Sequence, residues 1–235
     1  EKTMLPRIQY ITHPDENFED LSWVDSLAKG GIRWIQLRVK KNHFETRHPQ
    51  LDYKTFFTET LFDLTEKCET AGVVLTVNDH YSFAIKSNVD GAHVGKEDES
   101  HSTVRTFLGD DKIIGATANS IDDILSYNLE LLDYIGLGPY TFTTTKDKDK
   151  LSPSLGSRGY NTCLQIMKAK NLDTPIYAIG GVELEDIPQI MQTGVYGIAI
   201  SGCIHNEKFD VTHIQKFVDL VEQNVKQTSP LTERK

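Results

Sequence analysis

The sequence predicts one α/β domain built as a closed, parallel (β/α)8 barrel, the TIM-barrel class. Eight short apolar runs alternate with eight amphipathic stretches along the 235 residues, as strands and helices alternate in such a barrel. The apolar runs are nearly continuous, for example IYAI at 176–179, because barrel strands are buried on both faces. No GxGxxG motif follows the first run, which counts against the alternative of an open doubly wound sheet.

Each strand is predicted where four or five mostly apolar residues stand together. The strands are expected at residues 8–12, 33–37, 73–77, 91–94, 112–116, 134–137, 176–179 and 197–200. A helix is expected after each strand, where apolar residues recur with helical spacing. The helices are expected at residues 18–29, 53–70, 81–87, 102–108, 121–129, 158–170, 185–192 and 211–223.

The lengths of the connections indicate where chemistry occurs. A barrel of this class fits the whole chain, 1–235, as one domain, with the polar segment 226–235 expected to fray. Two connections after strands are longer than a barrel needs, at residues 41–51 and 139–157. Loops after strands open on the catalytic face, so both are expected to cover substrate. Within the second, the segment 141–151 is expected to be mobile without ligand and to close over it.

Composition and charge narrow the classes of partner. The formal net charge is −9 at pH 7 without a stripe of clustered cations, so nucleic acid and anionic membranes are not expected partners. No apolar run reaches membrane-spanning length, and no leader sequence opens the chain. The three cysteines, Cys68, Cys163 and Cys203, lie far apart and are odd in number, which is typical of reduced thiols. We therefore expect a cytoplasmic protein whose partners are small molecules.

Polar residues follow the second strand. Gln36, Arg38 and Lys40 alternate along an extended segment and so share one side of it, which presents two cations and an amide together. Such a group can bind an anionic ligand. A solvated strand end is an equally open interpretation of these three residues alone.

Carboxylates follow the third and fourth strands. Asn78 and Asp79 end the third strand, and Asp98 follows the fourth, so adjacent strand–helix units bring the two carboxylates to one rim. Two carboxylates with phosphate oxygens and water suit Mg²⁺. The alternative is that Asp79 and Asp98 cap the helices that follow them.

The last three strands end in groups that suit phosphate. The sixth leads into a threonine-rich loop with Thr143, Thr145 and Lys146, although such a stretch can also be an ordinary mobile loop. The turns after the seventh and eighth strands contain Gly181 and the pair Ser201–Gly202. Small residues there let backbone N–H groups approach a ligand, as in the phosphate sites of many barrels.

Other chemistries find no support in the sequence. His80, His93 and His101 do not stand at metal-ligand spacing, and no nucleophile with a companion histidine and acid is evident. Zinc chemistry and hydrolysis through a protein nucleophile are therefore not expected.

Taken in order, six segments resemble the successive motifs of the thiamin phosphate synthase family. They are QLRVK, VNDH, DGAHVGKED, GPYTFTTTK, AIGGV and GIAISGCI, and they span roughly residues 8–204. The resemblance implies an enzyme that joins an aminopyrimidine methyl diphosphate to a thiazole phosphate and releases pyrophosphate. Thr117 stands where the family usually has serine, and Val39 stands where it often has glutamate.

The resemblance also assigns residues to roles. It implies that the diphosphate contacts Gln36, Arg38, Lys40, Asn78 and Lys146, that Thr117 lies in the pyrimidine site, and that Mg²⁺ binds Asp79 and Asp98. It implies that the thiazole phosphate contacts Thr143, Thr145, Gly181, Ser201 and Gly202. Breaking the carbon–oxygen bond needs the leaving oxygens neutralised, so Arg38, Lys40 and Lys146 are the expected catalytic cations.

Two other functions stay open from the sequence. A thiazole tautomerase of the same superfamily would bind the thiazole phosphate without needing the cations or the carboxylate pair. In this chain Asn119 lies near the place where the tautomerase has its catalytic histidine. A non-catalytic barrel that binds a thiamin precursor is the third possibility, because fold does not dictate function.

Overall fold

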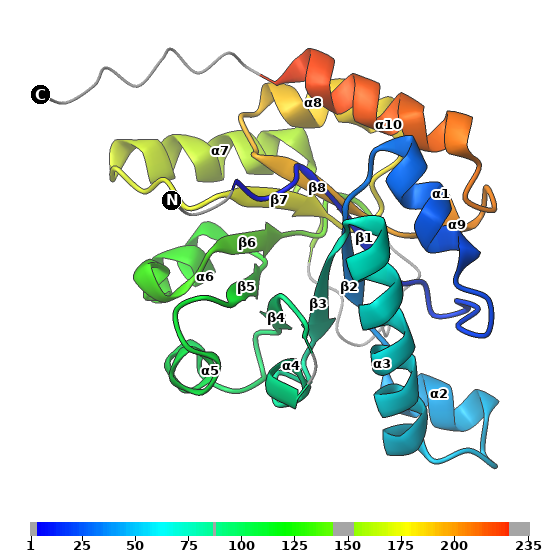
Figure 1. The fold of residues 1–235 in the computed structure, drawn as a ribbon. Helices are drawn as coiled ribbons and strands as arrows, with labels where there is room; N and C mark the ends of the chain where they lie inside the picture. The colour runs from blue at the N-terminus through cyan, green and yellow to red at the C-terminus, as the bar shows by residue number, and fades with distance from the viewer. Residues whose placement is uncertain (1–3, 87, 143–152, 226–235) are drawn as a thin grey trace, which may run out of the picture.

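The chain folds into a closed barrel of eight parallel strands (Figure 1), which confirms the predicted fold class. The computed structural model describes residues 4–86, 88–142 and 153–225. Each strand pairs with the next, and β8 pairs with β1 through Tyr10 and Ile200, which closes the barrel. The strands are β1 (Ile8–Ile11), β2 (Trp34–Leu37), β3 (Val74–Asn78), β4 (Gly91–Val94), β5 (Ile113–Ala118), β6 (Tyr134–Leu137), β7 (Ile176–Ile179) and β8 (Gly197–Ile200).

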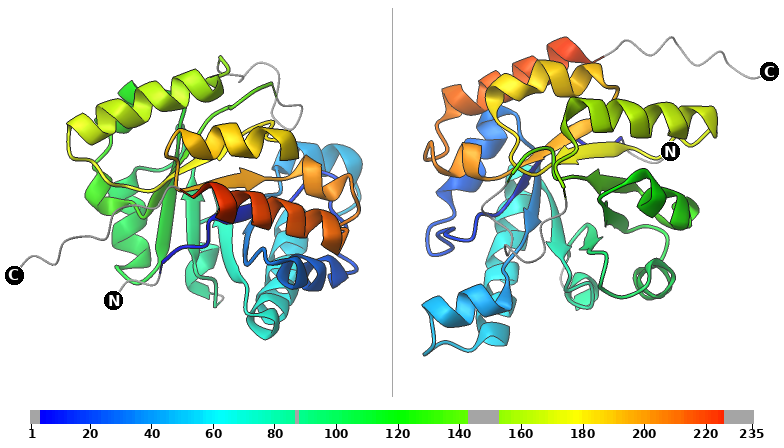
Figure 2. Two further views of the ribbon diagram at one scale, coloured as in Figure 1. Left: turned by 90° about the horizontal axis from the view of Figure 1, so that it is seen from above. Right: turned by 180° about the vertical axis from the view of Figure 1, so that it is seen from behind.

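Helices surround the barrel on its outside, as Figures 1 and 2 show. Side-chain caps start several of them, for example Asp52, whose carboxylate accepts a hydrogen bond from the Thr55 N–H, and Ser100, which accepts one from Thr103. The α-helices are α1 (Ser22–Gly30), α2 (Lys41–Arg47), α3 (Tyr53–Ala71), α4 (Phe83–Lys86), α5 (His101–Leu108), α6 (Ile121–Ser126), α7 (Gly156–Ala169), α8 (Ile187–Gln192), α9 (Gly202–His205) and α10 (Val211–Asn224). Within the described residues, two 3₁₀ turns accompany them, η1 (Leu129–Leu131) and η3 (Leu184–Asp186).

Apart from shifts at helix ends, such as α1 beginning at Ser22 and α4 at Phe83, the structure differs from the predicted helices at three places. The segment 41–51, expected as a loop, contains α2, which has a single buried residue, Phe44, and so gave no helical periodicity. Helix α9 follows β8 directly and was not predicted. The predicted helix 121–129 is split, because Asn128 caps the separate turn η1.

Aromatic side chains close the barrel near the amino-terminal ends of its strands. Trp34, Tyr134 and Tyr177 are fully buried there, with ring centroids 4.9 to 5.4 Å apart and steep edge-to-face angles. Gly115 on the neighbouring strand β5 leaves space for the Tyr134 ring, because a Cβ added at Gly115 would lie under 3.0 Å from carbons of that ring. This aromatic floor leaves the opposite end, at the carboxyl ends of the strands, as the place for a site.

Two further expectations concern cysteines and membranes. Cys68, Cys163 and Cys203 are all buried free thiols, as predicted. In the described ranges, no helix has the length and apolar character that crossing a membrane requires. Residues 226–235, expected to fray, lie outside the described residues.

Candidate active site

A cavity of about 250 Å³ lies at the carboxyl ends of the strands. We call it the mouth cavity. It brings together predicted residues from β2, β3, β5 and the turns after β7 and β8: Gln36, Arg38, Asn78, Thr117, Gly181, Ser201 and Gly202. Because these residues come from distant parts of the chain, their convergence depends on barrel closure.

The end of β2 is held in place by β1. The Arg38 N–H donates to Thr12 Oγ1 at 2.8 Å, and the Thr12 hydroxyl donates to the Arg38 carbonyl at 3.0 Å. Gln36 is buried and donates its amide N–H to Gln9 Oε1. Lys40 does not line the mouth cavity; its ammonium forms an ion pair with Asp79 at 2.5 Å. The three side chains predicted to act together are thus divided between the cavity and its carboxylate rim.

Asp79 and Asp98 lie in contact at this rim. The Asp98 carboxyl donates a hydrogen bond to Asp79 and accepts one from the Gly95 N–H at 2.7 Å. Burial and the Asp79 charge raise the pKa of Asp98. For Asp79, burial acts in the same direction, but the hydrogen bond from Asp98 and the Lys40 ammonium outweigh it, so its pKa is lowered. With Lys40 as the neighbouring cation, Asp79 and Asp98 therefore favour a state in which they share one proton.

Neither carboxylate caps a helix. Ser100 is the N-cap of α5, not Asp98. At the start of α4, the N–H groups of Phe83 and Ala84 donate to the backbone carbonyls of His80 and Tyr81. Asp79 has a left-handed backbone (φ 66°), which aspartate tolerates better than most residues do. The capping interpretation is therefore wrong for both residues.

The carboxylate pair fits Mg²⁺ in its chemistry. The described part of the chain contains no cluster of three or more His, Cys, Asp or Glu side chains that could hold a metal ion by themselves. Mg²⁺ commonly binds through one or two carboxylates and completes its shell with water and phosphate oxygens. Asp79 and Asp98 supply that number of ligands beside a cavity that opens to solvent.

The turns after β7 and β8 differ from the expectation in one respect. Gly181 was predicted to leave space for a ligand beside its backbone, but an added Cβ would meet the Phe142 carbonyl oxygen at 2.5 Å and Thr141 Cγ2 at 2.6 Å. Its left-handed φ of 66° also disfavours other residues. Gly181 therefore allows the loop after β6 to pack closely against this turn. The hydroxyl of Ser201, by contrast, is buried and has no hydrogen-bond partner among the described residues.

Three predicted residues cannot be placed. Thr143, Thr145 and Lys146 lie outside the described residues, as does most of the segment 141–151 that was expected to close over the ligand. Their assignment stays a prediction from the sequence.

His93 is a site residue that the sequence did not identify. It is 4% exposed and lines the mouth cavity, and its Nε2 lies 2.8 Å from Thr117 Oγ1. Its Nδ1 lies 2.7 Å from the Tyr134 hydroxyl. The histidines were considered only as metal ligands, whereas the available signal was one polar residue within the otherwise apolar strand GAHV.

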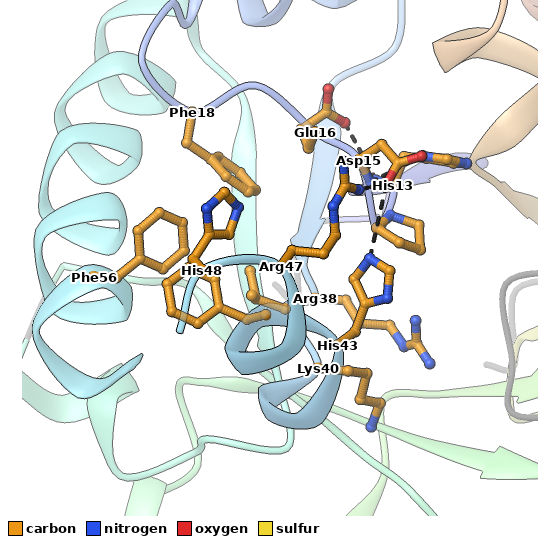
Figure 3. Close-up of a pocket in the computed structure, with 13 residues that line it drawn as sticks. His13, Asp15, Glu16, Phe18, Arg38, Lys40, His43, Arg47, His48 and Phe56 are labelled. Carbon is orange, nitrogen blue, oxygen red and sulfur yellow. Dashed lines mark hydrogen bonds and ion pairs between the residues drawn. The ribbon is translucent and has the colours of Figure 1, made fainter. Parts of the chain in front are cut away.

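A second cavity, of about 330 Å³, lies beside the mouth cavity (Figure 3). It is enclosed by the β1–α1 loop, the end of β2 and α2, and we call it the side cavity. Arg47 reaches from α2 to form an ion pair with Asp15, and His43 lies 3.7 Å from the same carboxylate. Arg38 lines both cavities. The segment predicted to cover substrate as a loop is thus a helical wall on this side.

A buried carboxylate anchors the β1–α1 loop next to both cavities. The Glu16 side chain is 1% exposed, accepts a hydrogen bond from the Tyr10 hydroxyl and lies 3.2 Å from His205 Nδ1. The ring of His205 stacks on His13 with centroids 4.1 Å apart. These contacts join the first and last loops of the barrel.

Comparison with known proteins identifies the family. The family model for thiamine monophosphate synthase matches residues 8–204. The chain is 40% identical over 205 residues to a thiamine-phosphate synthase of Flavobacterium psychrophilum, covering 86% of this chain and 92% of that protein. It is 39% identical over 213 residues to one of Phocaeicola vulgatus, covering 91% and 97%.

A solved structure agrees at the level of fold. Thiamine phosphate pyrophosphorylase from Pyrococcus furiosus superposes with a TM-score of 0.74 at 20% identity, covering 93% of this chain and 96% of that one. With the family match over most of the barrel and relatives near 40% identity, the chain belongs to the thiamine monophosphate synthase family.

Proposed function

We propose that the protein joins an aminopyrimidine methyl diphosphate to a thiazole phosphate, forming thiamin phosphate and pyrophosphate. The observation that carries this proposal is the rim formed by Lys40, Asp79 and Asp98 beside a cavity that contains Arg38 and Asn78. Cations and carboxylates together suit a diphosphate that binds with a divalent metal ion. The cavity beside them offers amide and hydroxyl groups for a heterocycle.

The reaction needs no protein nucleophile. The carbon–oxygen bond between the pyrimidine methylene and the diphosphate breaks, and pyrophosphate leaves with the electron pair. The pyrimidine amino group stabilises the methylene cation, and the lone pair of the thiazole nitrogen forms the new carbon–nitrogen bond. We assign Arg38, Lys40 and Lys146 to neutralising the charge that develops on the leaving oxygens, and Gln36 and Asn78 to orienting the pyrimidine diphosphate.

Asp79 and Asp98 are proposed to hold Mg²⁺. When bound, the ion would neutralise leaving-group charge beyond what the side chains provide. Asp79 also orients Lys40, because its carboxylate pairs with the Lys40 ammonium.

The function is tested by measuring pyrophosphate release. The purified protein is incubated with both substrates, with Mg²⁺ or with excess chelator, and thiamin phosphate is quantified in parallel. We expect both products in equal amounts and only with the metal. Absence of both products under all metal conditions would rule out the synthase.

The tautomerase alternative is not favoured. It would require proton transfer near Asn119, whose side-chain amide donates to the Gly138 carbonyl at 2.6 Å. A carboxamide neither gains nor loses a proton readily at neutral pH, so this residue is suited to supporting the loop rather than to acid–base catalysis of an isomerisation.

The unpartnered hydroxyl of Ser201 leads to a prediction about the thiazole phosphate. We propose that this hydroxyl and the backbone of the turn Ser201–Gly202 bind the phosphate group. Ser201→Ala should raise the KM for thiazole phosphate about tenfold or more, because one hydrogen bond to a charged group contributes about 1.5 kcal/mol or more. The variant should be no less stable to heat, because it removes a buried hydroxyl that lacks a partner. A raised KM for the pyrimidine substrate instead would contradict this placement.

The sequence assignment of Lys146 is tested by Lys146→Ala. We expect turnover to fall by about a hundredfold, because a cation near the leaving group acts mainly in the transition state. Binding of thiazole phosphate, measured by calorimetry, should change little. Lys54→Ala, which removes an exposed lysine on α3, is the matched control. Equal losses of turnover and of thiazole phosphate affinity would argue against this role.

A further inference from the structure

A line of hydrogen-bonded side chains connects the aromatic floor to the mouth cavity. Tyr134 begins β6 at the floor, and its hydroxyl lies 2.7 Å from His93 Nδ1. His93 Nε2 in turn lies 2.8 Å from Thr117 Oγ1, which faces the mouth cavity. Tyr134 and His93 are 1% and 4% exposed. The line therefore runs through the interior and reaches solvent only at Thr117.

The strand register explains how Tyr134 reaches His93 across an intervening strand. Gly115 on β5 pairs with His93 on one side and with Tyr134 on the other. A side chain at Gly115 would collide with the Tyr134 ring. The absent side chain lets this ring lie across β5, with its hydroxyl directed at the imidazole.

The groups around Tyr134 set the direction of the hydrogen bonds. Burial raises the pKa of the Tyr134 phenol, so the phenol keeps its proton. The side-chain amides of Gln9 and Gln36 lower this pKa, which is the effect of N–H groups that donate to the phenol oxygen. Gln36 donates to Gln9 Oε1, and among the described residues Gln9 Nε2 has no closer partner than the Tyr134 phenol. The floor thus presents a surplus of N–H donors to the phenol oxygen. The Tyr134 hydroxyl proton therefore points away from these N–H groups and toward His93 Nδ1.

The His93 imidazole accepts a hydrogen bond on one side and donates one on the other. A neutral histidine has one accepting and one donating nitrogen. If Nδ1 accepts from Tyr134, Nε2 carries the proton and donates to Thr117 Oγ1. The Thr117 hydroxyl then accepts on its buried side, and its own proton is available to an acceptor in the mouth cavity. The Tyr127 hydroxyl also donates to the Thr117 carbonyl at 2.6 Å, which fixes the backbone here.

We propose that His93 and Tyr134 are positioning residues that present the Thr117 hydroxyl as a hydrogen-bond donor to a ring nitrogen of the aminopyrimidine. The inference rests on the proposed function and deepens it. A pyrimidine ring nitrogen only accepts hydrogen bonds, whereas the exocyclic amino group only donates while its lone pair is drawn into the ring. A donor at Thr117 therefore selects the edge of the heterocycle that faces β5.

The direction of the hydrogen bonds from Tyr134 through His93 to Thr117 can be measured in the protein without ligand. Nitrogen-15 NMR of histidine-labelled protein distinguishes the two neutral tautomers, and the His93 signals are identified by their loss in His93→Gln. We expect the proton on Nε2 in the wild type. Tyr134→Phe removes the donor to Nδ1 and should shift the ring toward the other tautomer. A wild-type His93 with its proton on Nδ1 would overturn the proposal.

The consequence for binding is measured by calorimetry with the aminopyrimidine methyl diphosphate alone. Thr117→Val, which keeps the shape and loses the hydroxyl, should weaken affinity about tenfold, and Thr117→Ser should recover most of that loss. Tyr134→Phe should weaken affinity about fivefold in the wild type and have no further effect when added to Thr117→Val. Losses that multiply in the double variant would contradict action through Thr117.

Tyr177→Phe is the matched control. Tyr177 is also a floor tyrosine, but its hydroxyl donates its proton to the Pro6 carbonyl at 2.6 Å and not to His93. This variant should lose similar packing and hydrogen bonding while keeping wild-type affinity. If it weakened affinity as much as Tyr134→Phe, the effect would be general to the floor. A wild-type protein that releases pyrophosphate but shows either contrary result would refute this inference and leave the proposed function intact.

Discussion

Asp79→Asn and Asp98→Asn are each expected to lower turnover by on the order of a hundredfold or more, which corresponds to about 2.7 kcal/mol of barrier. Both substitutions keep the size and shape of the side chain and remove the charge that would bind Mg²⁺. Asparagine also tolerates the left-handed backbone of Asp79. The measurements are pyrophosphate release over a range of Mg²⁺ concentrations and calorimetric titration of the metal.

Stability separates this role from a structural one. Asp98→Asn replaces one of two touching acids with an amide that can still donate to Asp79 and carries no like charge. Without metal, the variant should melt at the wild-type temperature or above it. Asp63→Asn, at an exposed position of α3, is the control for a lost surface carboxylate. Turnover within about twofold of wild type in both variants would contradict the magnesium assignment, because a tenfold change in rate is only about 1.4 kcal/mol of barrier.

Gly115→Ala is expected to cost about 3 kcal/mol of unfolding free energy, at the upper end for a methyl group forced into a filled core. The new Cβ would collide with the Tyr134 ring, which is confined by Trp34 and Tyr177. Gly136→Ala is the matched control. It adds the same methyl group on the next strand, where the nearest atom, His93 Cε1, is 3.3 Å away, and should cost about 1 kcal/mol or less.

Denaturant unfolding of the two alanine variants measures this difference. Similar unfolding free energies for both would mean that the aromatic floor yields easily to an added methyl group. Such a result would also weaken the inference that Gly115 fixes the position of the Tyr134 hydroxyl.

The strands were predictable because barrel strands bury both faces. Runs such as IYAI at β7 and GIAI at β8 are therefore apolar throughout, and the observed bounds agree with the predicted ones. Helix α2 was not predictable in the same way. Seven residues with a single buried side chain give no recurring pattern, and the helix depends on the stacking of Phe44 on Phe56, which is a tertiary contact.

The candidate site was predictable where function depends on residue type at a strand end. Asp79 and Asp98 were expected at one rim, and they lie there in contact. Lys40 lines only the side cavity, whereas Arg38 lines both cavities. This difference was not predictable, because the chain turns into α2 directly after Lys40. His93 and Tyr134 were missed because their relation requires the register of three strands around Gly115. No pattern along the chain encodes that register.

The side cavity affects the solvation of Arg38 and Lys40, the two proposed catalytic cations that the structure describes. Its lining includes Arg38 and Lys40 together with Asp15, His13 and other polar groups, which is the kind of surroundings that hold water. Burial and the neighbouring His205, His43 and Arg47 lower the pKa of His13 to about 4, so the His13 side chain stays uncharged at neutral pH. A guanidinium or ammonium that keeps part of its hydration shell avoids most of the self-energy of a buried ion. Arg38 and Lys40 can thus remain charged without ligand. In the proposed reaction, a diphosphate that fills the mouth cavity would displace water from Arg38 and so strengthen their attraction.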